Sequence, residues 1–372
     1  MTNETIPAGL HLPTGDLRYP AYLPDGTYGV VRSVDAQDLA DCGMQALMMN
    51  SFHLMQRPGS LTIQSMGGLH RFSGWQGPIF TDSGGFQAYS LIRQDPKFGV
   101  IQERGLSFQP EGAKRKFLLT PEKSVQLQAG YASDVIICLD DCTHVDTGVE
   151  EQRKAVRRTV DWAFRSKKEY QRIAAQKGWT EETRPRLFAV IQGGGSEELR
   201  RECASDLLEI GFDGFGFGGW PLDAEGRLLT DILTLTRSLV PRRFPMHALG
   251  VGHPQKVADC TAMGYDIFDS AMPTRDARHA RLYVYAKPLD QIQFTQGETW
   301  MRYLYVNDEK HIRTQDPISP YCDCHTCRNY SMGYLRHLFK LNDTLFQRLA
   351  TIHNLRFMTQ LTGLLREKYY AA

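Results

Sequence analysis

Residues 77–87 read GPIFTDSGGFQ, and this stretch decides how the rest of the chain is interpreted. An apolar run that is typical of a strand stops at Asp82. The Gly84-Gly85 pair that follows lets the backbone bend sharply and approach a ligand closely, and Phe86 offers a flat aromatic face. A solvated turn would read the same way in isolation. Because the arrangement recurs along the chain, it favours a series of strands that each end at a functional group.

Other short apolar runs also end at a polar residue or at glycine. They are Ala46–Met49 before Asn50, Val135–Leu139 before Asp140, Leu187–Ile191 before Gln192, Phe212–Phe217 before Gly218-Gly219, Met246–Leu249 before Gly250, and Tyr265–Phe268 before Asp269. Continuous apolar runs of this length are typical of parallel strands that are buried on both faces.

Helical patterns lie between these runs. They cover Glu150–Gln176, Ser196–Ile210, Asp223–Val240 and Pro254–Met263, and Thr120-Pro121 reads as an N-cap followed by proline at the first helical position. The repeated order of strand, polar strand end and helix predicts an α/β protein with a (β/α)8 TIM barrel. A doubly wound open sheet is the alternative, but no G-x-G-x-x-G loop follows a first strand.

In a TIM barrel the carboxyl ends of all strands converge on one face. We therefore expect Asp82, Asp140, Gln192, Gly219 and Asp269 to line one pocket.

The composition narrows the class of protein. The 372 residues include 43 Lys and Arg against 42 Asp and Glu, so a nucleic-acid partner would need a local basic patch. No hydrophobic signal segment and no run of about 18 apolar residues is present, which predicts a cytoplasmic protein that does not span a membrane. The eight cysteines are then expected to be metal ligands or small core residues in a reducing compartment.

Three of these cysteines, Cys322, Cys324 and Cys327, lie within one short turn. Neighbouring thiolates repel one another unless a metal ion shares them, and structural zinc takes four ligands. Free thiols in a surface loop and an iron–sulfur or redox site are the alternatives. The spacing does not choose the fourth ligand, for which the candidates are His311, His325, His337 and His353.

Taken together, these motifs resemble the tRNA-guanine transglycosylase family, whose members exchange guanine in tRNA for a 7-deazaguanine. The motifs that carry the resemblance are Thr81–Gln87, Leu139–Cys142, Ile191–Gly194, Gly218-Gly219, Gly250–Gly252, Phe268–Arg275, and the three cysteines with His353-Asn354. They follow one another in the family's order from about residue 20 to the C-terminal helix, and the complete set is highly specific.

The resemblance implies a barrel with a zinc subdomain inserted near its C-terminal end. The expected parts are residues 1–296 for the catalytic barrel, 297–353 for the zinc subdomain, and 354–372 for a C-terminal helix that completes the barrel. It also implies one structural Zn²⁺ held by Cys322, Cys324, Cys327 and His353. Family members commonly pair, so a homodimer is expected.

The resemblance also implies the roles of the pocket residues. Asp269 corresponds to the nucleophile and Asp82 to the general acid/base. Asp140 would accept hydrogen bonds from N1–H and N2–H of the base, while the Gln192 amide and the Gly219 N–H would donate to O6. Phe86 and Leu249 would cover the two faces of the flipped base, and Cys142 would line its pocket. Arg275 and Arg278 would hold the flanking nucleotides of tRNA.

Residues 220–225 depart from the family's usual Leu-Ala-Val-Gly-Glu loop and read WPLDAE. Pro221 has no N–H to donate, so the Trp220 carbonyl is expected to stay an acceptor for a cationic arm. This favours 7-aminomethyl-7-deazaguanine (preQ1) as the incoming base. A queuine-specific enzyme, a DNA-directed deazaguanine transglycosylase and a non-catalytic tRNA-binding subunit are the alternatives.

Overall fold

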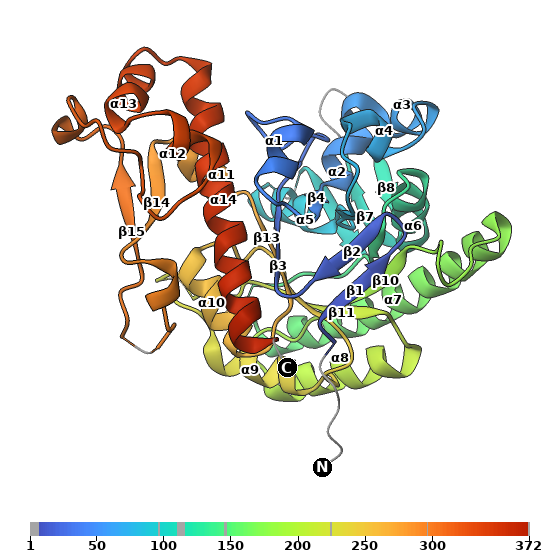
Figure 1. Cartoon of the computed structure of the whole chain (residues 1–372). Helices are drawn as coiled ribbons and strands as arrows, with labels where there is room; N and C mark the ends of the chain where they lie inside the picture. Colours follow the sequence, from blue (N-terminus) through green and yellow to red (C-terminus); the bar gives the residue numbers. More distant parts are fainter. Residues whose placement is uncertain are drawn as a thin grey trace.

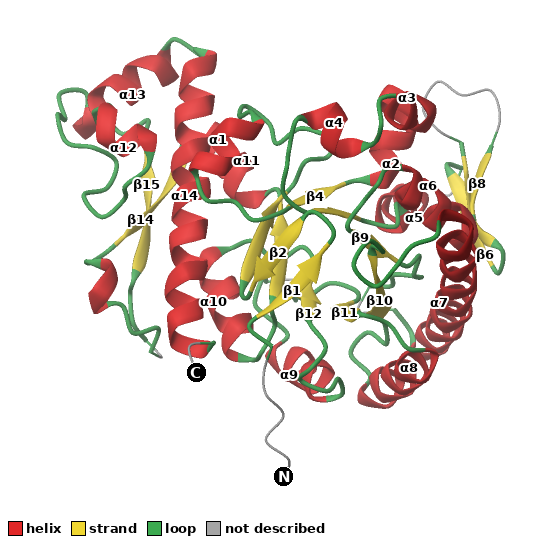
Figure 2. Ribbon diagram, turned by 45° about the vertical axis from the view of Figure 1, so that its right-hand side comes forward, coloured by secondary structure: helices red, strands yellow, loops and turns green. Residues whose placement is uncertain are grey.

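The computed structural model describes residues 7–95, 97–109, 116–144, 147–223, 225–295 and 297–370. An eight-stranded parallel sheet curls nearly closed into a barrel at its centre (Figures 1 and 2). Around the barrel the strands are β3 (Ala21–Pro24), β4 (Leu47–Met49), β5 (Ile79–Thr81), β9 (Val135–Ile137), β10 (Arg186–Ile191), β11 (Gly214–Phe217), β12 (Met246–Ala248) and β13 (Ile267–Ser270). Their spatial order follows their order in the chain, which confirms the TIM barrel and not the doubly wound sheet.

The first strand, β3, joins the two ends of this sheet. It pairs with β13 in parallel from Ala21 opposite Ile267 to Pro24 opposite Ser270. On its other side, a single parallel bridge links Asp25 to Met48 in the middle of β4. The barrel therefore closes where the chain passes from β3 into the loop after it.

Helices surround the barrel, and Figure 2 shows α7 and α8 curving around its outside. They are α1 (Ala36–Asp41), α2 (Ser51–Leu54), η1 (Met55–Gly59), α3 (Ser60–Ser65), α4 (Leu69–Ser73), α5 (Gly85–Gln94), α6 (Pro121–Gly130), α7 (Val149–Lys177), α8 (Glu197–Ile210), α9 (Thr230–Ser238), α10 (Pro254–Ala262) and α11 (Met272–Arg278). As predicted, Thr120 caps α6, accepting a hydrogen bond from the Lys123 N–H at 3.2 Å, with Pro121 at the first position.

The helix predicted over Asp223–Val240 is wrong in its first part, because α9 begins only at Thr230. The preceding residues form a tight turn. The Asp223 N–H donates to the Arg227 carbonyl at 2.9 Å, and Leu222 and Leu228 form an antiparallel bridge. Gly226, with φ of +77°, supplies the left-handed conformation that the turn needs. Ala224 lies outside the described residues.

Among the described residues three small sheets stand outside the barrel, one of them in the C-terminal part. The N-terminal hairpin joins β1 (Gly9–Leu12) to β2 (Gly15–Arg18). A three-stranded sheet of β6 (Gly99–Gln102), β7 (Gly105–Phe108) and β8 (Phe117–Leu119) is inserted between α5 and α6. The sequence patterns did not predict this insertion.

The C-terminal part begins after α11. It contains β14 (Arg281–Tyr285), η2 (Leu289–Gln291), β15 (Met301–Tyr305), η3 (Glu309–His311), α12 (His325–Asn329), α13 (Met332–Lys340) and α14 (Thr344–Tyr369). In Figure 1, α14 runs from this part down the side of the barrel. Tyr285 of β14 stacks on Phe357 of α14 with ring centroids 4.1 Å apart. The domain boundaries at 296 and 353 stay predictions.

No helix in the described ranges is both long enough and apolar enough to cross a membrane.

Candidate active site and metal centre

A cavity of about 520 Å³ opens at the carboxyl ends of the barrel strands. The predicted site residues that line it are Asp82, Phe86, Asp140, Cys142, Gly219, Leu249 and Asp269. These seven residues come from five separate segments of the sequence and line one pocket, as the convergence of strand ends predicts. Gln192, Arg275 and Arg278 are not part of its lining.

Asp269 stands in β13 with one carboxylate oxygen fixed and the other unbonded. Its Oδ1 lies 2.8 Å from Nε2 of the fully buried His247 and accepts the Gly250 N–H at 3.1 Å. No hydrogen-bond donor among the described residues contacts its Oδ2. A positioned carboxylate with one unoccupied oxygen that faces a cavity is suited to nucleophilic attack.

Asp82, at the end of β5, is surrounded by donors. Its Oδ1 accepts the N–H groups of Ser51 at 2.8 Å and Gly84 at 3.1 Å, and its Oδ2 accepts the amides of Asn50 at 2.6 Å and Gln87 at 3.3 Å. Burial nevertheless raises the pKa of Asp82 to about 7, against the effect of the two backbone N–H groups. A carboxyl group that titrates near neutral pH can both donate and accept a proton.

Gly84 makes this arrangement possible. Its φ of +77° places it in the left-handed region, where the chain leaves β5 and begins α5. The turn directs the Gly84 N–H back onto the Asp82 carboxylate. Gly84 is therefore part of the carboxylate's hydrogen-bond shell, whereas the Gly85 N–H donates to the Ser83 hydroxyl at 3.2 Å.

Asp140, at the end of β9, is paired with an amide from the next strand. Gln192 Nε2 donates to Asp140 Oδ2 at 2.6 Å, and the Gln192 side chain is buried behind the pocket wall. Burial raises the pKa of Asp140 to about 7, while the hydrogen bond from Gln192 opposes this rise. Gln192 thus orients Asp140 in this structure and does not point into the cavity.

Cys142 and Gly219 lie beside this pair. Burial raises the pKa of the Cys142 thiol, and the neighbouring Gly219 N–H and Gln192 amide oppose this rise. Gly219 has φ of +89°, a left-handed conformation that favours glycine. The thiol is therefore neutral and serves as a wall of the pocket.

Aromatic rings form the mouth of the pocket. Phe86 is 45% exposed, and its ring centroid lies 5.0 Å from that of Trp220. Trp220 also contacts His144 at 5.6 Å. Leu249 lines the same cavity and packs over Gly216, where an added Cβ would lie 3.0 Å from its Cδ1. Phe86 and Leu249 thus both present apolar surface to one cavity, which is what a flat ligand needs.

The two predicted RNA-binding arginines lie in α11, just beyond Asp269. Arg275 is exposed and Arg278 is half-buried, with its Nη1 donating to the Thr274 carbonyl at 3.0 Å. Burial lowers the pKa of Arg278, and the neighbouring Arg32 and Arg275 lower it further. Three cations therefore gather outside the pocket on the side of Asp269, which favours a contact with phosphate.

The short turn that carries Cys322, Cys324 and Cys327, here called the knuckle, contacts His353 in the C-terminal part. The ligand atoms of Cys322, Cys324, Cys327 and His353 all lie within 4.8 Å of one another. His353 Nδ1 is 3.3 Å from Cys327 Sγ and 3.7 Å from Cys324 Sγ. His353 Nε2 lies 2.7 Å from the Tyr283 carbonyl and donates to it, which leaves the Nδ1 lone pair directed at the sulfurs. These residues fit a metal ion.

The other candidate ligands lie elsewhere. Within the described ranges, His311, His325 and His337 do not belong to the metal-binding cluster. Tertiary contact between α14 and the knuckle selects His353, as the family resemblance implies.

Asn354 connects the cysteine and histidine cluster to α11, the helix that follows Asp269 in the chain. Its Nδ2 donates to the carbonyl of Pro273 in α11 at 3.0 Å and to that of Arg281 at 3.1 Å, and its Oδ1 accepts the Tyr283 N–H at 3.0 Å. Because Asn354 follows His353 directly in α14, an ordered metal site also fixes the start of α11.

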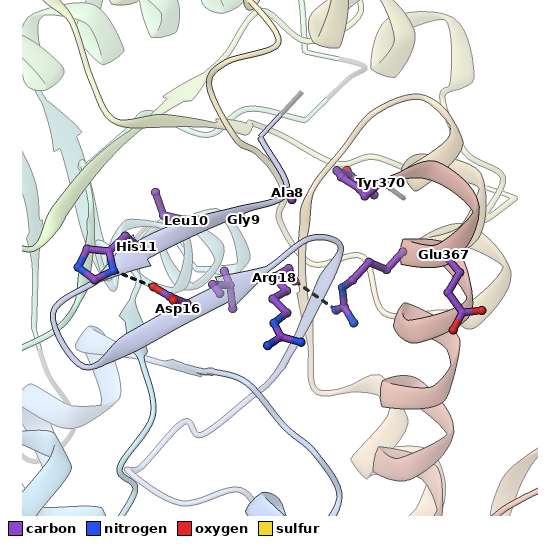
Figure 3. Close-up of a pocket in the computed structure, with 10 residues that line it drawn as sticks. Ala8, Gly9, Leu10, His11, Asp16, Arg18, Glu367 and Tyr370 are labelled. Carbon is purple, nitrogen blue, oxygen red and sulfur yellow. Dashed lines mark hydrogen bonds and ion pairs between the residues drawn. The ribbon is translucent and has the colours of Figure 1, made fainter. Parts of the chain in front are cut away.

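A second hollow lies between the N-terminal hairpin and the end of α14 (Figure 3). His11 and Asp16 pair with each other across the hairpin at 2.7 Å. The Arg366 guanidinium donates to the Arg18 carbonyl at 3.3 Å. None of the predicted site residues lines this hollow, and we assign the chemistry to the pocket at the strand ends.

Several pocket residues were missed from the sequence. Four of them line the cavity, namely Asp25, Asn50, His53 and Gln87. The fifth, His247, does not line the cavity but contacts Asp269. Asp25 follows the apolar run Ala21–Pro24 and obeys the same rule as the other strand ends. His247 carries no sequence signal, because it lies inside β12.

The fold and the pocket together define a barrel enzyme with two carboxyl groups, Asp82 and Asp140, whose pKa burial raises to about 7, and a third, Asp269, with one unbonded oxygen. The profile of the family described as "Queuine tRNA-ribosyltransferase" matches residues 8–369. The chain belongs to this family, the tRNA-guanine transglycosylases, and is a transferase of the glycosyl-transferring class.

Relatives with the same description are similar over nearly the whole chain. The protein from Thermoanaerobacter sp. (strain X514) is 35% identical over 358 residues, which cover 96% of this chain and 88% of the relative. That from Actinobacillus pleuropneumoniae serotype 3 (strain JL03) is 36% identical over 348 residues, with 94% and 84% covered. That from Psychrobacter sp. (strain PRwf-1) is 35% identical over 353 residues, with 95% and 86% covered. The resemblance read from the motifs is confirmed.

Proposed function

We propose that this protein exchanges a guanine in tRNA, at the wobble position of the anticodon, for preQ1 through a covalent intermediate on Asp269. The observation that carries the proposal is the pairing of two carboxyl groups in one pocket. Asp82 has a pKa of about 7, and Asp269 has one unbonded oxygen. An acid/base next to a nucleophilic carboxylate is the arrangement that retaining glycosyl transfer requires.

In the first step, Asp269 Oδ2 attacks C1′ of the target ribose as the bond from C1′ to N9 breaks. The electron pair of that bond stays on the guanine, which receives a proton from Asp82. In the second step, Asp82 accepts the proton from N9 of the incoming base, whose nitrogen attacks C1′ and releases Asp269. Two inversions give net retention, and no other reactant is needed.

Recognition of the base would depend on donors and acceptors around the cavity. Asp140 accepts from N1–H and N2–H, and its hydrogen bond from Gln192 keeps the carboxylate in place for this pair of contacts. The Gly219 N–H, and Gln192 if its amide turns from Asp140, would donate to O6. Phe86 and Leu249 would hold the flipped base between them.

The choice of preQ1 over queuine rests on the loop after β11. Trp220, Pro221 and Leu222 all line the cavity. The Trp220 carbonyl suits a cationic aminomethyl arm as a hydrogen-bond acceptor. Because Pro221 has no N–H, this peptide cannot turn to present a donor in its place. The bulk of Trp220 and Leu222 would crowd a larger substituent such as the cyclopentenediol of queuine.

One structural Zn²⁺ is proposed for the Cys322, Cys324, Cys327 and His353 cluster, since three thiolates and an imidazole are a preferred zinc ligand set. Zinc with four protein ligands has no open position, so it would contribute folding energy and no chemistry. A homodimer, which follows from the family, and a cytoplasmic location, which follows from the sequence composition, stay predictions.

Labelled-guanine exchange tests the proposal. The full-length protein should incorporate radiolabelled guanine into a tRNA with guanosine at the wobble position, and not into the same tRNA with adenosine there. Competition by preQ1 at lower concentration than queuine would support the base assignment. Exchange into duplex DNA alone would instead favour the DNA-directed enzyme, and binding of tRNA without exchange would favour a non-catalytic subunit.

A further inference from the structure

Asp25 adds a fourth carboxylate to Asp82, Asp140 and Asp269 in the pocket, and the proposed exchange reaction does not use it. It lines the same cavity as Asp82 and Asp269. In the register of β3 on β13, Leu23 lies opposite Asp269 and Pro24 opposite Ser270. Asp25 is the next residue of the chain and therefore follows directly after the strand pair that contains Asp269. The bridge from Asp25 to Met48 fixes its backbone on the other side.

The barrel separates a base side from a sugar side in this pocket. The base-reading residues Asp140, Gln192 and Gly219 follow β9, β10 and β11, whereas β13, β3 and β4 lie on the opposite side of the ring. When the purine points toward β10 and its C1′ lies at Asp269, the ribose must lie against β13, β3 and β4. Asp25 therefore faces the sugar and not the base.

The Asp25 carboxylate still has acceptor capacity there. Within the described ranges its side chain has one hydrogen-bond donor, the Thr27 hydroxyl, at 2.7 and 2.6 Å from its two oxygens. No Lys or Arg of the described residues forms an ion pair with it. The acceptor is held in position by Thr27 and lines the cavity, where it can accept a hydrogen bond from a hydroxyl group.

We propose that Asp25 accepts a hydrogen bond from the 2′-hydroxyl of the target nucleotide and thereby selects RNA over DNA. The inference rests on the proposed exchange reaction and adds a specificity-determining residue to it. The 2′-hydroxyl is attached to the carbon next to C1′, and it distinguishes RNA from DNA. Hydrogen bonds to the hydroxyl next to the reacting carbon strengthen in the transition state of glycosyl transfer.

The test compares two RNA stem-loops that differ at one atom. One contains guanosine at the target position and the other 2′-deoxyguanosine, and kcat/KM for labelled-guanine exchange is measured on both. The proteins are the wild type, Asp25→Val, Asp25→Asn and the control Asp16→Asn, which changes an exposed carboxylate of the N-terminal hairpin. Circular dichroism and thermal unfolding check that each variant is folded.

We expect the wild type and Asp16→Asn to prefer the ribonucleotide by about ten- to a hundredfold, as for a hydrogen bond to a charged acceptor. Asp25→Val should reduce this preference to less than about threefold, because it has no acceptor. Asp25→Asn should lie between the two, since its amide oxygen is a weaker acceptor than a carboxylate. If Asp25→Val is unfolded, the ratio of Asp25→Asn decides.

An unchanged preference in the folded variants would overturn the proposal, and so would an equal loss on both substrates. A wild type that exchanges guanine equally in both stem-loops would also overturn it while leaving the exchange reaction intact. A wild type without exchange in either stem-loop or in full-length tRNA would instead refute the proposed function itself.

Discussion

The Nε2 of His247 lies 2.8 Å from Oδ1 of Asp269, and the imidazole that makes this contact is completely buried. His247 Nδ1 has no hydrogen-bond partner among the described residues. An Nε2–H donor directed at the carboxylate is consistent with this, because the other nitrogen then needs no acceptor. The contact fixes the carboxylate plane and leaves Oδ2 directed at the cavity.

We predict that His247→Phe slows formation of the covalent RNA adduct by about ten- to a hundredfold, the value of one hydrogen bond to a charged group. His247→Gln, which retains an amide donor, should recover part of the rate. Single-turnover trapping measures the adduct, and the affinity for tRNA should stay within about twofold of wild type, since no such bond to RNA is lost. Equal adduct rates in all three proteins would show that His247 only fills space.

Asp269→Asn should abolish base exchange while tRNA binding persists. The amide keeps the shape of the side chain but is a poor nucleophile. Denaturing electrophoresis should show a covalent RNA adduct with the wild type and none with the variant, and a filter-binding assay should show tRNA bound to both. Exchange near the wild-type rate would exclude Asp269 as the nucleophile.

The two half-reactions should respond oppositely to pH because burial raises the pKa of Asp82 to about 7. The protonated fraction falls above this value, so guanine release should slow about tenfold per pH unit there. The carboxylate fraction falls below it, so incorporation of the new base should slow at acid pH. Rapid-quench measurements from pH 5.5 to 9 would resolve the two limbs.

Asp140 titrates in the same range, with a pKa of about 7. Its protonation removes acceptors for the base and should raise the KM for free guanine and for tRNA at acid pH, whereas the rate of guanine release at saturating tRNA should not fall. Asp82→Asn should flatten the pH dependence of both half-reactions, while these changes in KM persist. A release rate at saturating tRNA that falls at acid pH would mean that Asp82 does not act as an acid.

Cys324→Ser should reduce bound zinc from about one ion per chain to well below that, because structural metal sites tolerate few ligand changes. Cys260→Ser, which changes a buried cysteine of α10 outside the cluster, is the matched control and should keep its metal. Inductively coupled plasma mass spectrometry measures the content. Hydrogen exchange should increase in β14, α12 and α11 of Cys324→Ser, since Asn354 links them. Unchanged zinc would contradict the ligand assignment.

Arg275→Ala and Arg278→Ala should each raise the KM for tRNA by about ten- to a hundredfold, the value of a charge-assisted contact to phosphate. The KM for free guanine should stay nearly unchanged, because neither side chain lines the base pocket. Arg201→Ala, on the outer side of α8 where it pairs with Glu197, is the control. Wild-type kinetics in both variants would show that these arginines are merely solvated.

The strand ends could be located from the sequence because the rule behind them is local. Each short apolar run ended at a polar residue, and the convergence of parallel strands in a barrel brings Asp82, Asp140 and Asp269 to one pocket without further information. The exception was β3, which ends before Asp25. This strand has four residues, and one of them is proline, which is unusual inside a strand.

Partners of these side chains depend on contacts that no local pattern contains. His247 meets Asp269 because two neighbouring strands pair in one register, which places residue 247 opposite 267. Gln192 was expected in the cavity, yet the structure turns its amide onto Asp140. The pairing of the neighbouring strands β9 and β10 brings the two side chains together.

The sequence by itself determined the barrel, its acidic strand ends and three of the four metal ligands, because these follow from short-range spacing. Only the tertiary structure decided that His353 joins the three cysteines, that His247 contacts Asp269 and that Asp25 lines the same pocket. The physical reason is that each of these contacts joins segments far apart in the chain, and its geometry depends on how strands and helices pack.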